Sequence, residues 1–192
     1  VDGKRQPGNV RMGHALEVVE RYENAFVWLS LKEPSTAQME RVAEIFDIED
    51  LVVDDVVDAH QRPKIERHDE QLFMVVRSVS YRDDEEVADA REIISTGEVQ
   101  MIVGEKFAIT IRHGARLPDL TAKLEDEEEL AVLGPTAVAW AVSDYLVDNY
   151  LKVTDSLEDD VDDLENEVFT PRRTINIDKI YTCLLYTSDA AD

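Results

Sequence analysis

The chain has 192 residues, 44% of them hydrophobic, which is long enough to bury the core of one globular domain. Its 43 acidic against 20 basic residues give a formal net charge of -23, so nucleic acids and anionic lipid surfaces are poor partners and cations are favourable ones. The single cysteine, Cys183, excludes an internal disulfide, and no apolar run approaches the roughly 18–20 residues of a membrane span. We therefore expect this chain, as given, to be soluble.

The first third of the chain predicts a polar tail followed by alternating helices and strands. Residues 1–13 are assigned no element, and a short helix is expected over Ala15–Tyr22. The apolar run Ala25–Leu31 has the length and composition of a buried strand. Ser35 then begins a helix as its N-cap, with Gln38 as the capping-box partner. The apolar side chains of this helix share one face: Met39, Val42, Ala43 and Phe46.

A second helix, begun by Glu49-Asp50, ends in an acidic corner. Asp54, Asp55 and Asp58 crowd its last turns, where the helix dipole disfavours each carboxylate by about 0.3–1 kcal/mol. The following segment, His60-Gln61-Arg62-Pro63-Lys64, stops the helix at its proline. Either the basic side chains of this segment or a bound cation should balance the three carboxylates.

After the corner the hydrophobic pattern changes to the period of two that is typical of strands. The acidic residues 83–86 indicate a solvated loop between them. We predict an antiparallel or mixed sheet that begins with a hairpin, in which Lys64–Arg67 pairs with the central strand Leu72–Tyr81. Two further strands are predicted at Val99–Val103 and Phe107–Arg112, and Glu92–Ser95 is a candidate edge strand.

From Leu117 onward the pattern becomes helical. One helix is predicted over Leu117–Leu130 and a long one over Thr136–Phe169, which would span about 50 Å and is typical of a stalk or an oligomer contact. Acidic residues of the long helix follow steps of 4, 7, 4 and 3 and so lie on one stripe: Asp144, Asp148, Asp155, Asp159 and Asp162. This stripe is either a solvated face or a cation-attracting surface.

The order of elements, the acidic corner before His60-Gln61-Arg62-Pro63-Lys64 and the acidic long helix resemble the cytoplasmic domain of CorA-type magnesium and cobalt transporters, over about Phe26 to Lys179. The resemblance implies an α/β/α funnel domain, with a mixed, largely antiparallel sheet between helical layers and a long acidic C-terminal helix leading to a truncated stalk. Residues 14–180 would then be a divalent-cation-sensing domain at the cytoplasmic face of the cell membrane. Its function would be regulatory and not enzymatic.

The resemblance also implies which residues bind metal. In that family homopentamers form, and divalent ions held between neighbouring cytoplasmic domains keep the pore closed. Asp55 corresponds to the inter-subunit Mg²⁺ ligand, whose partner carboxylate would lie on the neighbour's stalk helix. Asp54 and Asp144 correspond to a second, adjacent acidic cluster, and Asp148 on the same stripe is a further candidate. The expected ion is Mg²⁺, with Co²⁺, Ni²⁺ or Zn²⁺ as alternatives.

Combining residues and resemblance gives a hypothesis for the corner. Arg62 and Lys64 would balance it within the subunit, and Asp55 would face outward as half of a cation site. The family's two membrane spans and its Gly-Met-Asn signature are missing here, so we expect no ion conduction and contact with a membrane only through absent helices. Residues 181–192 lose the expected pattern and indicate a truncation scar or an out-of-frame tail.

Three other interpretations remain open. The chain resembles equally the domain of a zinc transporter of the same superfamily, and its long helix would also suit a plain acidic interaction module. A metal-dependent hydrolase would use Asp54, Asp55, Asp58 and His60. Against the hydrolase, the sequence contains no nucleophile elbow, phosphate loop or second metal-ligand motif.

Overall fold

The computed structural model describes residues 1, 4–6, 11–81, 94–127, 130 and 133–169. The chain divides into two compact units, one of Val1–Ser78 with Thr96–Leu146 and one of Val79–Ser95 with Val147–Asp192. The predicted loop 83–86, Glu92 of the predicted edge strand and the tail 181–192 lie outside the described residues. In the part that is described, no helix has the length and apolar character needed to span a membrane.

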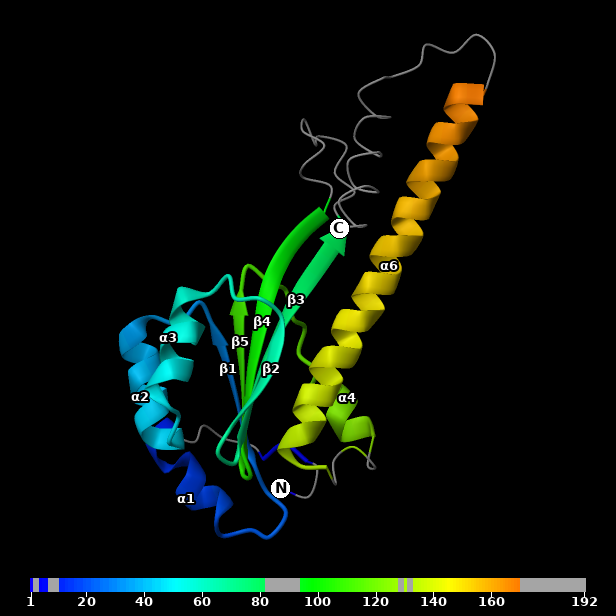
Figure 1. The fold of residues 1–192 in the computed structure, drawn as a ribbon. Coiled ribbons are helices and arrows are strands. Elements are labelled where there is room, and N and C mark those ends of the chain that lie inside the picture. Colours follow the sequence, from blue (N-terminus) through cyan, green and yellow to red (C-terminus); the bar gives the residue numbers. More distant parts are fainter. Residues whose placement is uncertain (2–3, 7–10, 82–93, 128–129, 131–132, 170–192) are drawn as a thin grey trace. The chain divides into compact units, whose positions relative to one another are not determined.

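The first unit is built on a mixed five-stranded sheet, as the sequence predicts (Figure 1). β1 runs parallel to β5, whereas β2–β3 and β4–β5 are antiparallel pairs. The last residues of β3 and the first of β4 belong to the second unit. The strand order is β1-β5-β4-β3-β2, with β1 (Val27–Lys32), β2 (Lys64–His68), β3 (Gln71–Tyr81), β4 (Ile94–Val103) and β5 (Phe107–His113).

Two strand predictions are corrected by this topology. The run Ala25–Leu31 was predicted to be a buried strand, but β1 lies at the edge of the sheet and its side chains are half-buried or exposed, because it has only one neighbour, β5. The predicted edge strand Glu92–Ser95 is not a separate element, since Ile94 and Ser95 form the beginning of β4.

Helices cover both faces of the sheet and give the unit three layers (Figure 1). One face carries α2 (Thr36–Phe46) and α3 (Asp50–Asp58), together with α1 (Ala15–Val19) and the short 3-10 helix Met12–His14. The other face carries α4 (Thr121–Asp126) and the first turns of α6 (Pro135–Phe169). The predicted α/β/α arrangement is therefore confirmed.

Alternation along the strands sends apolar side chains into two separate cores. Phe73, Val75 and Ile109 face α2 and α3, where they pack with Phe46 and Val56. Neighbouring positions face α6, so that Val99, Met101 and Ala108 pack with Val138, Val142 and Leu146. Each helix therefore has a fixed apolar side against the sheet and turns its polar side outward.

The helix signals in the sequence are confirmed for α2 and α6 but not for α4. The capping box of α2 forms as predicted, with the Gln38 backbone N–H donating to Ser35 Oγ at 3.4 Å and the Ser35 N–H donating to Gln38 Oε1 at 2.9 Å. Of the predicted helix Leu117–Leu130, the structure forms α4 from Thr121 to Asp126, and residues 128–129 lie outside the described part. Pro118 disfavours a helical Leu117, and Asp119 Oδ1 accepts the Thr121 N–H at 3.0 Å, so the helix begins later.

The second unit contains the remaining part of α6, Val147 to Phe169, with the ends of β3 and β4. Tyr81 at the end of β3 donates its hydroxyl to Asp160 Oδ2 at 2.8 Å. Ser80 Oγ lies 3.5 Å from the Ser95 carbonyl oxygen. One acidic residue of α6 thus accepts a hydrogen bond within its own unit.

The capping box leads to a first prediction. Replacing Ser35 by Ala leaves the Gln38 backbone N–H without its side-chain acceptor and should lower the free energy of unfolding by about 1 kcal/mol. Thr36→Ala, one residue further on at an exposed position, is the matched control and should change stability by much less. Urea denaturation measures both, and equal losses for the two variants would contradict a capping role for Ser35.

Candidate functional site

The acidic corner is positioned by the apolar face of α3. Val52, Val53 and Val56 are buried against the sheet, and this orientation leaves Asp54 and Asp58 exposed to solvent. Asp55 lies between these two faces and is half-buried. The helix ends because Ala59 and the next residue have positive φ, 52° and 56°, which breaks the helical conformation before Pro63.

Lys64, the first residue of β2, supplies the positive charge that this helix end requires. Its Nζ lies 2.6 Å from Asp55 Oδ2 and 2.7 Å from Glu66 Oε2, and it sits 5.3 Å from the centre of the Phe73 ring. The Lys64 and Asp55 side chains are only 25% and 24% exposed, so solvent screens this pair less than a surface pair.

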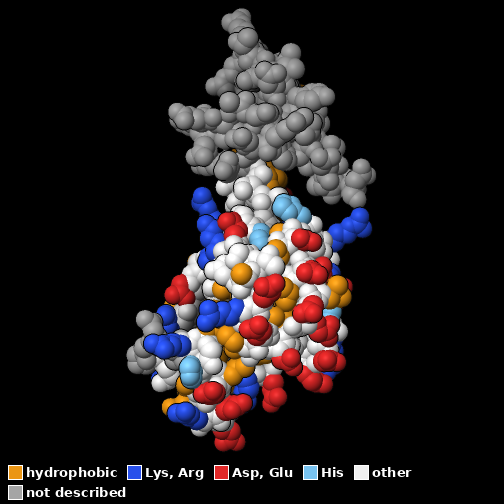
Figure 2. Space-filling view, turned by 90° about the vertical axis from the view of Figure 1, so that its left-hand side faces the viewer, with side chains coloured by type: hydrophobic (Ala, Val, Ile, Leu, Met, Phe, Trp, Pro, Cys, Tyr) orange, Lys and Arg blue, Asp and Glu red, His pale blue; other side chains and the backbone are white. Residues whose placement is uncertain are grey.

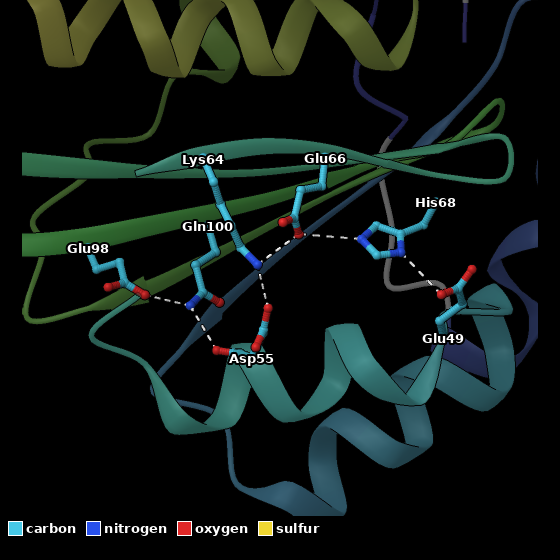
Figure 3. Close-up of polar contacts among 7 residues, drawn as sticks. All are labelled: Glu49, Asp55, Lys64, Glu66, His68, Glu98 and Gln100. Atoms are coloured by element: carbon cyan, nitrogen blue, oxygen red, sulfur yellow. Dashed lines mark hydrogen bonds and ion pairs between the residues drawn. The ribbon is translucent and has the colours of Figure 1, made fainter. Parts of the chain in front are cut away.

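A longer series of polar contacts continues from Lys64 along the same face of β2. Lys64, Glu66 and His68 alternate along the strand and therefore point to the same side of the sheet. His68 lies between two carboxylates, with Nε2 3.6 Å from Glu66 Oε2 and Nδ1 3.1 Å from Oε2 of Glu49. We call the five residues Asp55, Lys64, Glu66, His68 and Glu49 the charge ladder (Figure 3). It joins both ends of α3 to the edge strand β2.

Buried polar residues on β4 continue the ladder toward the interior. Gln100 is fully buried and donates from Nε2 to Glu98 Oε1 at 2.6 Å and to the Asp55 backbone carbonyl at 3.4 Å (Figure 3). Glu98, 2% exposed, lies 3.5 Å from Arg77 Nη1, and Arg77 Nη2 donates to the Gln61 carbonyl at 3.1 Å. The backbone on both sides of the corner is thereby held to the centre of the sheet.

The ionic contacts shift the pKa values of two ladder groups. Hydrogen bonds to Asp55 and then to Glu66 raise the pKa of Lys64 above its ordinary value. The hydrogen bond from Lys64 is the main cause that lowers the pKa of Glu66. Lys64 therefore stays charged and Glu66 stays ionised through the neutral range, which keeps the contact between these two side chains ionic there.

The position of Asp55 corrects the hypothesis that it faces outward while Arg62 and Lys64 neutralise the corner. Lys64 does balance the corner, but it does so by binding Asp55 itself. Arg62 is exposed and forms no ion pair with any residue of the described part. Lys64 reaches Asp55 because side chains alternate between the two faces of β2, and the Lys64 side chain lies on the face that is covered by α3.

The other predicted metal ligands are not brought together within one chain. Asp54 is on α3, whereas Asp144 is on α6, whose first turns cover the opposite face of the sheet (Figure 1). The Asp144 side chain is ion-paired with Lys123. Asp148 is exposed on the part of α6 that belongs to the second unit. Among the residues that the structure describes, no group of three acidic, His or Cys side chains converges to hold a metal ion. The cluster required by a hydrolase, Asp54, Asp55, Asp58 and His60, is therefore not formed.

The surface around α2 and α3 is nevertheless acidic. Figure 2 looks onto this side of the molecule and shows Asp and Glu gathered over one part of it, with Lys and Arg mainly along the other. The exposed acidic residues of this layer come from both helices and from the N-cap of α3: Glu40, Glu44, Glu49, Asp50, Asp54 and Asp58. Such a surface attracts cations over a distance of about a Debye length.

The sequence contains a signal for the buried polar residues Glu98 and Gln100, which the prediction missed. Glu98 and Gln100 alternate with Val99 and Met101 in a strand that was predicted from its apolar residues. Two polar residues at this spacing share one face of the strand, and a buried polar face requires partners from a neighbouring element. The pattern indicates that such partners exist but does not identify α3.

Comparison with known proteins places this fold and site in context. A family described as "CorA-like Mg2+ transporter protein" matches residues 23–184. The chain is 24% identical over 152 residues to YfjQ of Bacillus subtilis (strain 168), whose name describes a metal ion transporter. It is 26% identical over 138 residues to the cobalt/magnesium transport protein CorA of Thermotoga maritima. These matches cover 78% and 69% of the chain but 44% and 37% of the relatives, so the chain spans less than half their length.

A solved structure supports the fold. The soluble domain of CorA from Methanocaldococcus jannaschii superposes with a TM-score of 0.58 at 14% identity, covering 78% of this chain and 57% of that one. At this identity the likeness concerns the arrangement of the backbone.

The ladder leads to a prediction about stability and pH. Lys64→Met leaves Asp55 and Glu66 without their shared cation, and loss of the contact with Asp55 should lower the free energy of unfolding at neutral pH by about 1 kcal/mol. Because the pKa of Glu66 is lowered in the folded state, its stabilisation is present above its ordinary pKa of 4.5 and is lost as the pH falls through the folded value. The difference between variant and wild type should therefore shrink in acid.

Urea denaturation of both proteins across the acidic range measures this difference. Arg67→Met is the matched control, because the Arg67–Glu70 pair is 71% and 89% exposed and its loss should matter little at any pH. A Lys64→Met deficit that stays constant from neutral pH into acid would show that the ion pairs do not stabilise the corner.

Proposed function

The chain belongs to the CorA-like Mg2+ transporter family, whose members transport ions and are not enzymes, and we propose that it is the regulatory domain of a divalent metal ion transporter. In this proposal the domain lies at the cytoplasmic face of the membrane and binds Mg²⁺ between subunits to gate transport of Mg²⁺ or Co²⁺. The names of the two curated relatives, which describe metal ion and cobalt/magnesium transport, support the choice of ions.

Asp55 is the residue that carries the proposal. Mg²⁺ prefers oxygen ligands, gives up its waters reluctantly and usually takes only one or two carboxylates. Asp55 offers one carboxylate, 24% exposed, beside an acidic surface, so its chemistry fits such an ion. Because no three ligands converge in the described part of one chain, the remaining ligands would come from water and from a second copy.

A site shared between copies explains how weak binding could regulate a pore. If each site binds with a Kd near the free Mg²⁺ concentration, occupancy stabilises the bound state by about 0.4 kcal/mol per site, or about 2 kcal/mol over the five sites of a pentamer. That total shifts an equilibrium between closed and open states about thirtyfold. A sensor that responds to physiological changes in Mg²⁺ needs this magnitude.

The other acidic candidates have secondary roles in this proposal. Asp54 is exposed beside Asp55, so it can add a second carboxylate or hold a bridging water. Asp144 is ion-paired with Lys123 on the opposite face of the sheet, so it can meet Asp54 only across two copies of the chain. Asp148 is exposed and increases the local acidity.

Magnesium titration tests the proposal. Millimolar Mg²⁺ should promote association of the chain, measured by sedimentation velocity, and protect it from limited proteolysis, because the shared site joins two copies. The Asp55→Ala variant should lose both effects. Glu44→Ala removes an exposed charge from α2 and serves as the matched control, which should respond as the wild type does.

The same titration separates the alternatives. Wild-type protein that is indifferent to millimolar Mg²⁺, or an Asp55→Ala variant that responds normally, would contradict the proposed site. A response to Zn²⁺ at concentrations where Mg²⁺ has none would favour the zinc transporter interpretation. Association independent of any divalent ion would favour an acidic interaction module.

A further inference from the structure

We infer that Lys64 is a built-in competitor for the metal ion at Asp55, and that Glu66 accepts the Lys64 ammonium when the metal binds. The inference rests on the proposed function and specifies how its binding site is regulated. Two observations carry it. Lys64 Nζ already lies 2.6 Å from the carboxylate that would bind the metal, and 2.7 Å from a second carboxylate.

The first step is the occupation of Asp55. Lys64 binds Asp55 Oδ2, so a divalent ion must displace the ammonium or share the carboxylate with it. Sharing is unfavourable because the two cations repel each other at short distance. Lys64 is 25% exposed and lies over the Phe73 ring, which limits how far it can withdraw into solvent. The metal therefore binds more weakly than it would to a free carboxylate.

The second step is the movement of the displaced ammonium. Glu66 lies on the same face of β2 and is already in contact with Lys64, so displacement from Asp55 does not leave Lys64 unpaired. Glu66 is itself in contact with His68, which contacts Glu49 at the N-cap of α3. The ladder thus provides a fixed acceptor for the ammonium, and a small shift of Nζ exchanges one partner for the other.

This arrangement gives the two neighbours of Asp55 opposite effects. Lys64 weakens metal binding by competition, while Glu66 strengthens it by accepting the competitor. A merely structural role for both residues would move metal binding in the same direction, because loss of either would loosen the corner. The sign of each effect is therefore the decisive observable.

The experiment measures the Mg²⁺ concentration at the midpoint of association for the full chain at constant ionic strength. Lys64→Gln should lower the midpoint roughly tenfold, the effect of removing one positive charge near a divalent ion in water. Arg62→Gln is the matched control, since it removes the same charge from the same segment without contact to Asp55, and it should lower the midpoint much less.

The opposite variant is Glu66→Gln, which should raise the midpoint severalfold because Lys64 then keeps Asp55 as its only carboxylate partner. Glu70→Gln removes the same charge from the turn of the same hairpin, where Glu70 is 89% exposed, and should raise it much less. The inference is overturned if Lys64→Gln leaves the Mg²⁺ midpoint unchanged or raises it. It is also overturned if Glu66→Gln raises the midpoint no more than Glu70→Gln does.

Failure of this inference is distinguishable from failure of the proposed function. If wild type responds to Mg²⁺ through Asp55 but Lys64→Gln is not tighter, the competitor idea fails and the sensor stands. If wild type does not respond to Mg²⁺, the proposed site fails, and the inference that rests on it fails with it, whatever Lys64→Gln does.

A measurement on the wild type removes the dependence on variant folding. The ammonium group of an ion-paired lysine gives a resolvable ¹⁵N–¹H signal when its exchange with water is slow. Mg²⁺ should shift the Lys64 signal at the concentrations that drive association, while a monovalent salt at matched ionic strength should not. An unchanged Lys64 signal at saturating Mg²⁺ would overturn the exchange of partners.

Discussion

The ion pair between Lys64 and Asp55 is the contact on which the arrangement of the corner depends. Three carboxylates at the C-terminal end of α3 oppose the helix dipole, so this end of the helix requires a nearby cation. Lys64 supplies it from the first residue of the neighbouring strand, 2.6 Å away. The same contact joins the beginning of β2 to the last turns of α3, whose apolar face is held against the sheet by Val52, Val53 and Val56.

The rest of the layer follows from the geometry of the sheet. Alternation along β2 places Glu66 and His68 beside Lys64, and alternation along β4 places Glu98 and Gln100 beneath the end of α3. Buried polar side chains must have partners, so the packing of α3 is specified by polar contacts as well as by its apolar face. These contacts join Asp55 to Glu49, the N-cap of α3, through three side chains of β2.

Much of the fold could be predicted from the sequence, and the failures have physical causes. The capping box of α2, the acidic end of α3 and the long α6 are local signals and are confirmed. The position of β1 at the sheet edge depends on its parallel pairing with β5, a contact between distant residues that no local pattern encodes. The partner of Lys64 was missed for the same reason: the strand period shows which side it faces, but only packing shows that α3 covers that side.

The central proposal is that a divalent cation competes with Lys64 for Asp55, and paramagnetic NMR tests it most directly. Mn²⁺ replaces Mg²⁺ at oxygen sites and broadens the signals of nearby nuclei. Titrated into the chain, it should first broaden the backbone signals of Asp54, Asp55 and Lys64, and excess Mg²⁺ should reverse the effect. Broadening on the acidic stripe of α6 that leaves Asp55 and Lys64 unaffected, or that spreads evenly over all exposed carboxylates, would contradict the account.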